Sequence, residues 1–180
     1  EGESMTAKLI IAGFGGQGIL FFGKLLSYKA LFENKEVSWL PSYGPEMRGG
    51  TATCSVTISS SLIGSPIIDE PDILVAMNLP SLDKFESKVK SGGKIFVDST
   101  MVDRKVKRSD VEAFYIPSSE ISQEMGNVAL SNIVLLGKVL KECPELGRNK
   151  IEEAIKKVVS AKHQDMYEIN LEAINRGFNY

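Results

Sequence analysis

The sequence predicts an α/β fold of three layers, α/β/α, built on a Rossmann-like mixed, mostly parallel sheet. The first observation is the stretch Lys8 to Leu26, KLIIAGFGGQGILFFGKLL, in which an apolar run of strand length precedes a glycine-rich turn and then apolar residues at helical spacing. The second is the buried strand Ile73 to Met77, ILVAM, which leads through a helical segment to another strand at Lys94 to Val97. Strands that alternate with helices are typical of a parallel sheet.

The first third of the chain should form a βαβ unit. We expect a strand at Leu9–Ala12, a helix from Gly16 to Phe32 that ends near Asn34, and a second strand at Val37–Leu40. The next segment, 41–50, holds two prolines and three glycines without periodicity, which predicts a shaped loop. Because it follows the carboxyl end of a strand, it should lie on the same rim of the sheet as the glycine turn.

A strictly alternating segment, 51–58, predicts a half-buried and antiparallel strand. Its apolar face carries Cys54, which we interpret as a buried core residue rather than a nucleophile. The segment 62–68 is expected to return as a partner or edge strand. The remaining predicted elements are the strand 73–77, the helix 81–89, the turn 91–93, the strands 94–97 and 112–116, and the helices 117–125, 127–142, 149–159 and 164–176.

Two asparagines, Asn127 and Asn149, are predicted N-caps of the late helices. The sequence shows no repeat or linker, so we expect one domain over residues 5–180. Residues 1–4 precede Met5, which has the character of a natural start, and are expected to be a remnant of an expression tag.

The glycine turn, Gly13 to Gly18, combines several physical roles. One glycine should permit a sharp reversal at positive φ, and others should permit close approach of the helix, or of a ligand to main-chain N–H groups. Helix N-termini also attract anions. A dinucleotide is one interpretation, and tight packing of the helix on the strand is another. The dinucleotide reading requires an acidic residue about 20 positions later at a strand end. The count reaches Glu36, which instead starts its strand, so this reading loses most of its support.

Composition excludes several function classes. The net charge of −2 gives no electrostatic footprint for nucleic acid. No apolar run approaches the roughly 20 residues that span a bilayer, so we expect no membrane partner and a cytoplasmic protein. With Cys54, Cys143 and the single histidine His163, the chain cannot supply four cysteine ligands to an iron–sulfur cluster or build a histidine-rich zinc site. We therefore expect no metal site and no catalytic residue in this chain.

One charged pair, Glu46 and Arg48, lies on the loop at the expected rim. The pair either braces its own loop or presents Arg48 as a planar fork to a carboxylate, a phosphate or an acidic neighbouring chain. Both interpretations remain open from the residues alone.

Three ordered motifs resemble the gamma subunit of 2-oxoacid:ferredoxin oxidoreductases. They are the turn GFGGQG at 13–18, the loop SYGPEMRGG at 42–50 and the stretch PDILVAMN at 71–78. Gly126, Asn127 and the segment 132–137 also resemble the late helix of that family. The resemblance covers nearly all of residues 8–139.

This resemblance implies a subunit of an enzyme that oxidatively decarboxylates a 2-oxoacid to its acyl-CoA and reduces ferredoxin. It implies alpha and beta partner chains that hold thiamine diphosphate, and a ferredoxin-like delta subunit or domain that holds iron–sulfur clusters. No cofactor would be bound by this chain alone. The form of the 42–51 loop is closest to the 2-oxoglutarate and branched-chain 2-oxoacid types, with 2-oxoglutarate the most favoured substrate.

On this basis the candidate ligand or interface residues lie on the turn, the loop and two strand or helix ends. They are Gly13, Gly15, Gly16, Gln17, Gly18, Ser42, Tyr43, Gly44, Pro45, Glu46, Arg48, Gly49, Gly50, Asn78 and Asn127. The loop is expected either to pack near the thiamine-bearing chains or to shape the approach of CoA. The alternative function is a free-standing NAD(P)- or FAD-binding oxidoreductase or sensor domain.

Overall fold

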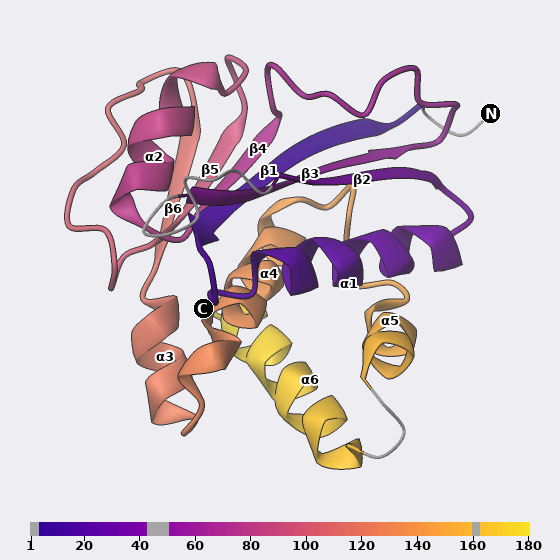
Figure 1. The fold of residues 1–180 in the computed structure, drawn as a ribbon, viewed down its shortest axis with the longest axis vertical. Helices are drawn as coiled ribbons and strands as arrows, with labels where there is room; N and C mark the ends of the chain where they lie inside the picture. Colours follow the sequence, from indigo (N-terminus) through magenta and orange to yellow (C-terminus); the bar gives the residue numbers. More distant parts are fainter. Residues whose placement is uncertain (1–3, 43–50, 160–162) are drawn as a thin grey trace.

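The computed structural model describes residues 4–42, 51–159 and 163–180. A twisted six-stranded sheet lies between helices (Figure 1). The strands are β1 (Thr6–Phe14), β2 (Glu36–Ser42), β3 (Thr51–Ser59), β4 (Ile73–Ala76), β5 (Lys94–Asp98) and β6 (Glu112–Ile116). The helices are α1 (Ile19–Phe32), α2 (Leu79–Phe85), α3 (Ser118–Glu124), α4 (Ser131–Glu142), α5 (Ile151–Val158) and α6 (Gln164–Phe178), with 3-10 turns η2 (Glu86–Lys88) and η3 (Val128–Leu130).

The strand order is β2-β3-β1-β4-β5-β6, which confirms a mixed, mostly parallel sheet. The pairs β1–β4, β4–β5 and β5–β6 are parallel, whereas β3 is antiparallel to both β1 and β2. In register, Ser42 is opposite Thr53, and Thr51 is opposite Phe14. The carboxyl ends of β1 and β2 therefore lie on one rim, as the sequence predicted.

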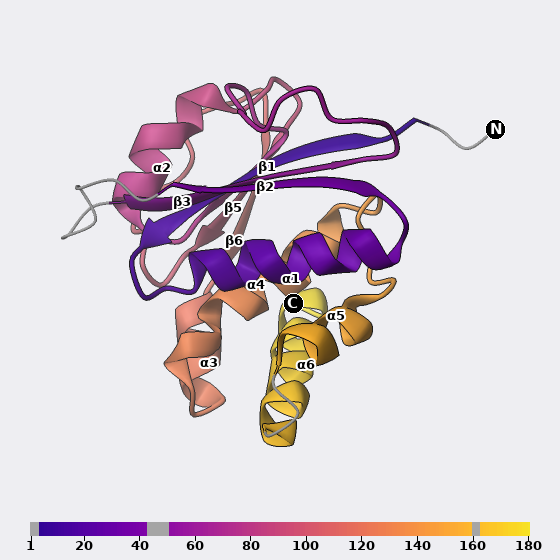
Figure 2. The ribbon, with the colours of Figure 1, turned by 45° about the vertical axis from the view of Figure 1, so that its right-hand side comes forward.

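Helices cover the two faces unequally (Figure 2). Alternate residues of β1 divide between two cores, because Leu9 and Ile11 face α1 and α4, whereas Ile10 and Ala12 face α2. On the first face, α5 packs against α1 and α6 packs against α4. The larger core therefore includes the C-terminal helices, which form an outer tier beneath the sheet.

Cys54 confirms the interpretation of the alternating strand. It is fully buried on the core face of β3 with Ala52, Val56 and Ile58. Burial raises the pKa of its thiol to about 12, as it does for Cys143, so neither thiol ionises near neutral pH.

The prediction of a strand at 62–68 is wrong. This segment is irregular, and its apolar residues Leu62 and Ile67 are 88% and 64% exposed. β1 and β3 are each already paired on both sides, so neither of these two strands offers an edge to this segment. Pro66 cannot donate to a ladder, which also opposes a strand here.

Several element boundaries also differ from the predictions. Helix α1 begins at Ile19 rather than Gly16, and α2 begins at Leu79 and ends at Phe85, before a 3-10 turn. The prediction of Asn149 as an N-cap is wrong, because Lys150, at a φ of 66°, precedes α5. Asn34, with a φ of 59°, confirms the predicted left-handed end of the first helix.

Candidate functional site

The glycine turn joins β1 to α1 and depends on three of its four glycines. Gly16 and Gly18 have φ values of 90° and 73°, which only glycine adopts without strain. Gly13 has no room for a side chain, since a Cβ there would lie 2.6 Å from Gln17 Oε1 and 3.1 Å from Met77 Cβ. Gly15 is exposed, has no positive φ and faces open space. Gly15 therefore meets neither requirement expected of the turn glycines.

Gln17 clamps the turn to the neighbouring strand. Its Oε1 accepts a hydrogen bond from Phe14 N at 2.6 Å, and its Nε2 donates to Met77 O at 3.2 Å. Asn78 Nδ2 also donates to Gln17 Oε1, at 3.3 Å. The Gln17 amide thus lies between the carboxyl ends of β1 and β4. After β1 the chain crosses to the face of the sheet that α1 covers, and after β4 it crosses to the opposite face, which α2 covers. In doubly wound folds this switch point is where a ligand binds.

Asn132, on the buried side of α4, fixes the other end of the turn. Its Nδ2 donates to Gly18 O at 2.9 Å, and the same amide group lies in direct contact with the place where a Gly18 side chain would begin. Asn132 is only 2% exposed, and its Oδ1 has no hydrogen-bond partner among the described residues. It is one of four buried side-chain oxygens without a hydrogen-bond partner among the described residues, and the one that lies next to the glycine turn.

Asn132 is not among the site residues that the sequence predicted, whereas the two predicted asparagines, Asn78 and Asn127, act locally as caps. Asn78 Oδ1 accepts from Ser81 N at 2.9 Å and begins α2, while Asn78 itself is 1% exposed. Asn127 Oδ1 accepts from Ala129 N at 3.1 Å and caps η3, so the predicted N-cap role of Asn127 is confirmed one 3-10 turn before α4. Both residues lie near the glycine turn, Asn78 through Gln17 and Asn127 through a shared pocket.

That pocket has a volume of about 220 Å³ and lies between the start of α1, the turn η3 and the start of α6. Gly16 and Gly18 form one wall, and Asn127 and Asn132 form another. Met166 and Asn170, which sequence reasoning did not single out, close the third side. A larger groove of about 560 Å³ between α3 and α6 includes none of the predicted site residues.

The loop that the sequence placed beside the turn is described only at its anchors. Ser42 ends β2 and Thr51 begins β3, both on the rim where β1 ends. Tyr43, Gly44, Pro45, Glu46, Arg48, Gly49 and Gly50 lie outside the described residues. The interpretation of Glu46 and Arg48 accordingly stays a prediction.

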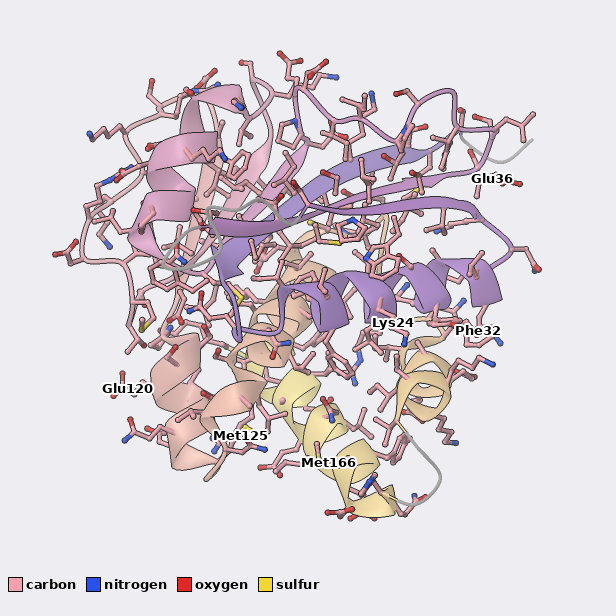
Figure 3. All side chains as sticks on the ribbon, viewed as in Figure 1. Lys24, Phe32, Glu36, Glu120, Met125 and Met166 are labelled. Atoms are coloured by element: carbon pink, nitrogen blue, oxygen red, sulfur yellow. The ribbon has the colours of Figure 1, made fainter. Side chains whose placement is uncertain are left out.

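The dinucleotide alternative is not favoured by this geometry. Glu36 begins β2 at the end of the sheet opposite the glycine turn (Figure 3). β3 also separates β2 from β1, whereas the Rossmann arrangement pairs these strands directly. The Gln17 side chain, finally, bonds to Phe14 N and Met77 O at the switch point between β1 and β4.

The described residues contain no group of three or more His, Cys, Asp and Glu side chains arranged to hold a metal ion. No helix in residues 4–42, 51–159 and 163–180 combines the length and the apolar character needed to cross a bilayer.

Comparison with known proteins gives consistent relatives. Residues 8–180 match the family model described as pyruvate ferredoxin/flavodoxin oxidoreductase. The 2-oxoglutarate synthase subunit KorC of Methanocaldococcus jannaschii is 36% identical over 97% of this chain and 93% of its own length. The ketoisovalerate oxidoreductase subunit VorA of Methanothermobacter marburgensis is 38% identical over 99% of this chain, but the chain spans only 37% of that protein.

The fold has a similarly close counterpart among solved structures. The gamma subunit of a keto/oxoacid ferredoxin oxidoreductase from Geobacter sulfurreducens PCA superposes with a TM-score of 0.82 and 27% identity. The match covers 96% of each chain. The fold of that gamma-subunit chain is thus reproduced nearly end to end.

Proposed function

Because this chain belongs to the pyruvate ferredoxin/flavodoxin oxidoreductase family, we propose that it is the gamma subunit of a 2-oxoacid:ferredoxin oxidoreductase. The complex would oxidatively decarboxylate a 2-oxoacid, form its acyl-CoA and reduce ferredoxin, in the cytoplasm. The observation that carries this proposal is the end-to-end match to subunits of similar length, KorC in sequence and the Geobacter gamma subunit in structure.

The division of chemistry within the complex follows from what this sequence offers. Its two cysteines are buried core residues, and the Gln17 amide bridges β1 and the end of β4 at the glycine turn. We infer that alpha and beta chains hold thiamine diphosphate and that a ferredoxin-like delta subunit or domain holds the iron–sulfur clusters. Residues 5–180 act as one domain without a cofactor of its own.

The contribution of this chain would come from the rim that carries the glycine turn and the anchors of the 43–50 loop. There the chain places Gly15 and Gly16 in exposed positions and leaves the first turn of α1 without a side-chain cap. A surface with bare main-chain N–H groups suits contact with a partner main chain or with CoA. We propose that this rim faces the thiamine-bearing chains and borders the path of CoA.

Two substrates have support among the relatives. KorC, which matches along its length, is named for 2-oxoglutarate, and VorA, which is slightly more identical, is named for ketoisovalerate. We propose 2-oxoglutarate first, because KorC has the size of this chain. Turnover assays of the complex with 2-oxoglutarate, ketoisovalerate and pyruvate would rank the three directly.

Isolation of the complex from the native organism tests the subunit assignment. With this chain tagged, we expect co-purification of chains that contain thiamine diphosphate and iron–sulfur clusters. Titration of the purified single chain with NAD and FAD should show no binding. Stoichiometric binding of either dinucleotide, or isolation of the chain without partners, would favour the alternative of a free-standing oxidoreductase.

A further inference from the structure

The pocket beside the glycine turn has an unusual chemistry for a site on the rim. Among the described residues that line it, none is charged, and the polar groups are the amides of Asn127, Asn132 and Asn170 together with glycine main chain. Phe21 and Leu130 supply apolar wall. An ionised ligand would find no opposite charge there, so the pocket suits a neutral occupant with an apolar body.

Exposed apolar side chains lie on the pocket lining and next to it in the sequence. Val128, next to the lining residue Ala129, is 67% exposed, and Met166 is 36% exposed. Met125 and Met166 lie on the lower side of the molecule, at the end of α3 and on α6 (Figure 3). Exposed apolar side chains around a depression are typical of a protein contact, because association removes them from water.

Asn132 supplies an independent indication that something binds here. Its orientation is fixed, since Nδ2 donates to Gly18 O, and Oδ1 then remains without a donor among the described residues. A buried acceptor without a partner destabilises the free chain, and a donor supplied by a binding partner would remove that cost. The oxygen is shielded in the free chain, so a donor reaches it only when a neighbouring side chain shifts. Met166, which lines the same pocket, is unbranched and can change its rotamer.

Size decides between a cofactor and a single side chain. Pockets for cofactors and drug-sized ligands hold about 300–1,000 Å³, whereas this one holds about 220 Å³. It is therefore small for a complete cofactor and suits one large apolar side chain.

VorA indicates where such a side chain could come from. The region of VorA that is similar to this chain makes up 37% of that protein, so in VorA it is joined to further polypeptide.

We propose that this pocket is the docking site for an apolar anchor side chain of the thiamine-bearing partner chain, with a main-chain N–H beside the anchor donating to Asn132 Oδ1. The inference rests on the proposed function and assigns the partner contact to a defined surface. It makes the pocket an assembly site rather than a cofactor site.

The test uses the reconstituted complex and the variant Ala129→Arg. Ala129 is exposed and lines the pocket, so an arginine there blocks the entrance with a charge and leaves the core intact. A second variant, Val128→Ser, removes apolar contact next to the pocket without adding bulk. The matched control is Leu62→Arg, because Leu62 is 88% exposed and lines a different pocket at the amino end of β1.

Dissociation constants for assembly, melting temperatures of the single chains and KM for CoA are measured on each variant. We expect Ala129→Arg to weaken assembly at least tenfold and Val128→Ser severalfold, with melting temperatures near wild type and normal assembly for Leu62→Arg. Normal assembly of both pocket variants overturns the proposal, and a raised KM for CoA in that case assigns the pocket to CoA. Equal weakening by Leu62→Arg also overturns it. A wild-type chain that fails to assemble contradicts the proposed function instead.

Discussion

Gly18 is the most constrained residue of the turn, because two independent requirements meet there. Its φ of 73° is unfavourable for any residue with a Cβ, and the Asn132 amide occupies the space that a Cβ would need. Gly15, three residues earlier, meets neither requirement. The two glycines look alike in the motif but differ in what they contribute to stability.

A pair of alanine variants measures this difference. Gly18→Ala should reduce the free energy of unfolding by about 1–3 kcal/mol, because of left-handed strain and the displaced Asn132 amide. Gly15→Ala should change it by less than about 0.5 kcal/mol, as for an ordinary surface site. Urea denaturation of both variants against wild type gives the comparison, and a Gly15→Ala loss as large as that of Gly18→Ala would contradict the assignment.

The sequence could predict the turn but not its closure. Four glycines between a strand and a helix are a local signal, which a window of a few residues contains. The bond from Asn132 to Gly18 joins positions 114 residues apart. The only hint was one amide at the start of an otherwise apolar helical segment, and nothing in the pattern said what it would contact.

Among the helices, α4 and α6 make the most extensive contact, and glycines permit their close approach. A Cβ on Gly137 would collide with Ile174 O, and a Cβ on Gly177 would collide with Val134 O, so the two main chains are in contact at both positions. Each glycine is in the middle or last turn of its helix, where propensity alone disfavours it. Helical periodicity predicted both helices, but it carries no information on their crossing.

Gly177→Ala tests this crossing. Although alanine is a better helix former than glycine, the added Cβ must separate the two helices, and overpacking of this kind costs about 1–3 kcal/mol. We therefore expect a lower melting temperature. Gly64→Ala is the matched control, since Gly64 faces open space and has no positive φ. An unchanged or raised melting temperature for Gly177→Ala would show that the helices separate without loss.

The connection between β5 and β6 has no helix and is held to α2 by charges. Glu86, 7% exposed, receives hydrogen bonds from Arg104 NH2 at 2.8 Å and from the main-chain N–H of Lys107. Arg104 also bonds Asp83 Oδ1 at 2.7 Å, and Arg108 donates to Glu86 O at 3.0 Å. These bonds add to the apolar packing of the connection, in which Val102 belongs to the smaller core and Val106 and Val111 pack against it.

This network predicts a specific loss of stability in acid. Burial acts to raise the pKa of Glu86, but the hydrogen bonds from Arg104 and Lys107 outweigh it and hold the pKa below its ordinary value of 4.5. A pKa lowered in the folded state gives stability that is present above about pH 4.5 and is lost as the pH falls through the folded value. Glu86→Gln should lower the melting temperature at pH 7 and reduce its fall below pH 4.5. A parallel pH profile for variant and wild type would contradict this.

The sequence predicted single helices and strands better than it predicted which strands pair in the sheet. The glycine turn, the alternating strand around Cys54 and the buried strands were predictable because each pattern repeats within a few residues. The segment 62–68 failed because its composition allows a strand, while the sheet has already used both edges of β1 and β3. Edge availability is a property of the whole sheet.

Taken as a whole, the molecule presents one rim where the glycine turn, the anchors of the 43–50 loop and the neutral pocket gather. The opposite end of the sheet carries Glu36 and the amino end of β1. This polarity agrees with an accessory subunit that meets its partners along one edge. The turn at 13–18 and the carboxyl end of the stretch 71–78 lie at this edge, as do Ser42 and Thr51, the described anchors of the loop.

Arg48 belongs to the 43–50 loop, which lies outside the described residues, and its role stays a prediction. If its guanidinium anchors the loop to a carboxylate or phosphate of the complex, Arg48→Ala should weaken assembly or CoA-dependent turnover by about 2 kcal/mol or more. Arg48→Lys should restore only part of the lost assembly or turnover, because lysine keeps the charge but not the planar fork of the guanidinium. Measurement of melting temperature, assembly and turnover on both variants separates this role from bracing by Glu46. Normal assembly with normal turnover would remove Arg48 from the site.

The central claim is that this chain completes an enzyme whose cofactors are on other chains, and reconstituted turnover tests it most directly. The partner chains, with and without this chain, are assayed with 2-oxoglutarate, CoA and a viologen acceptor, beside this chain alone. The account predicts turnover for the full set, at least tenfold less CoA-dependent turnover without this chain, and none for the chain alone. Viologen reduction by the isolated chain, or equal turnover when it is left out, would contradict the account.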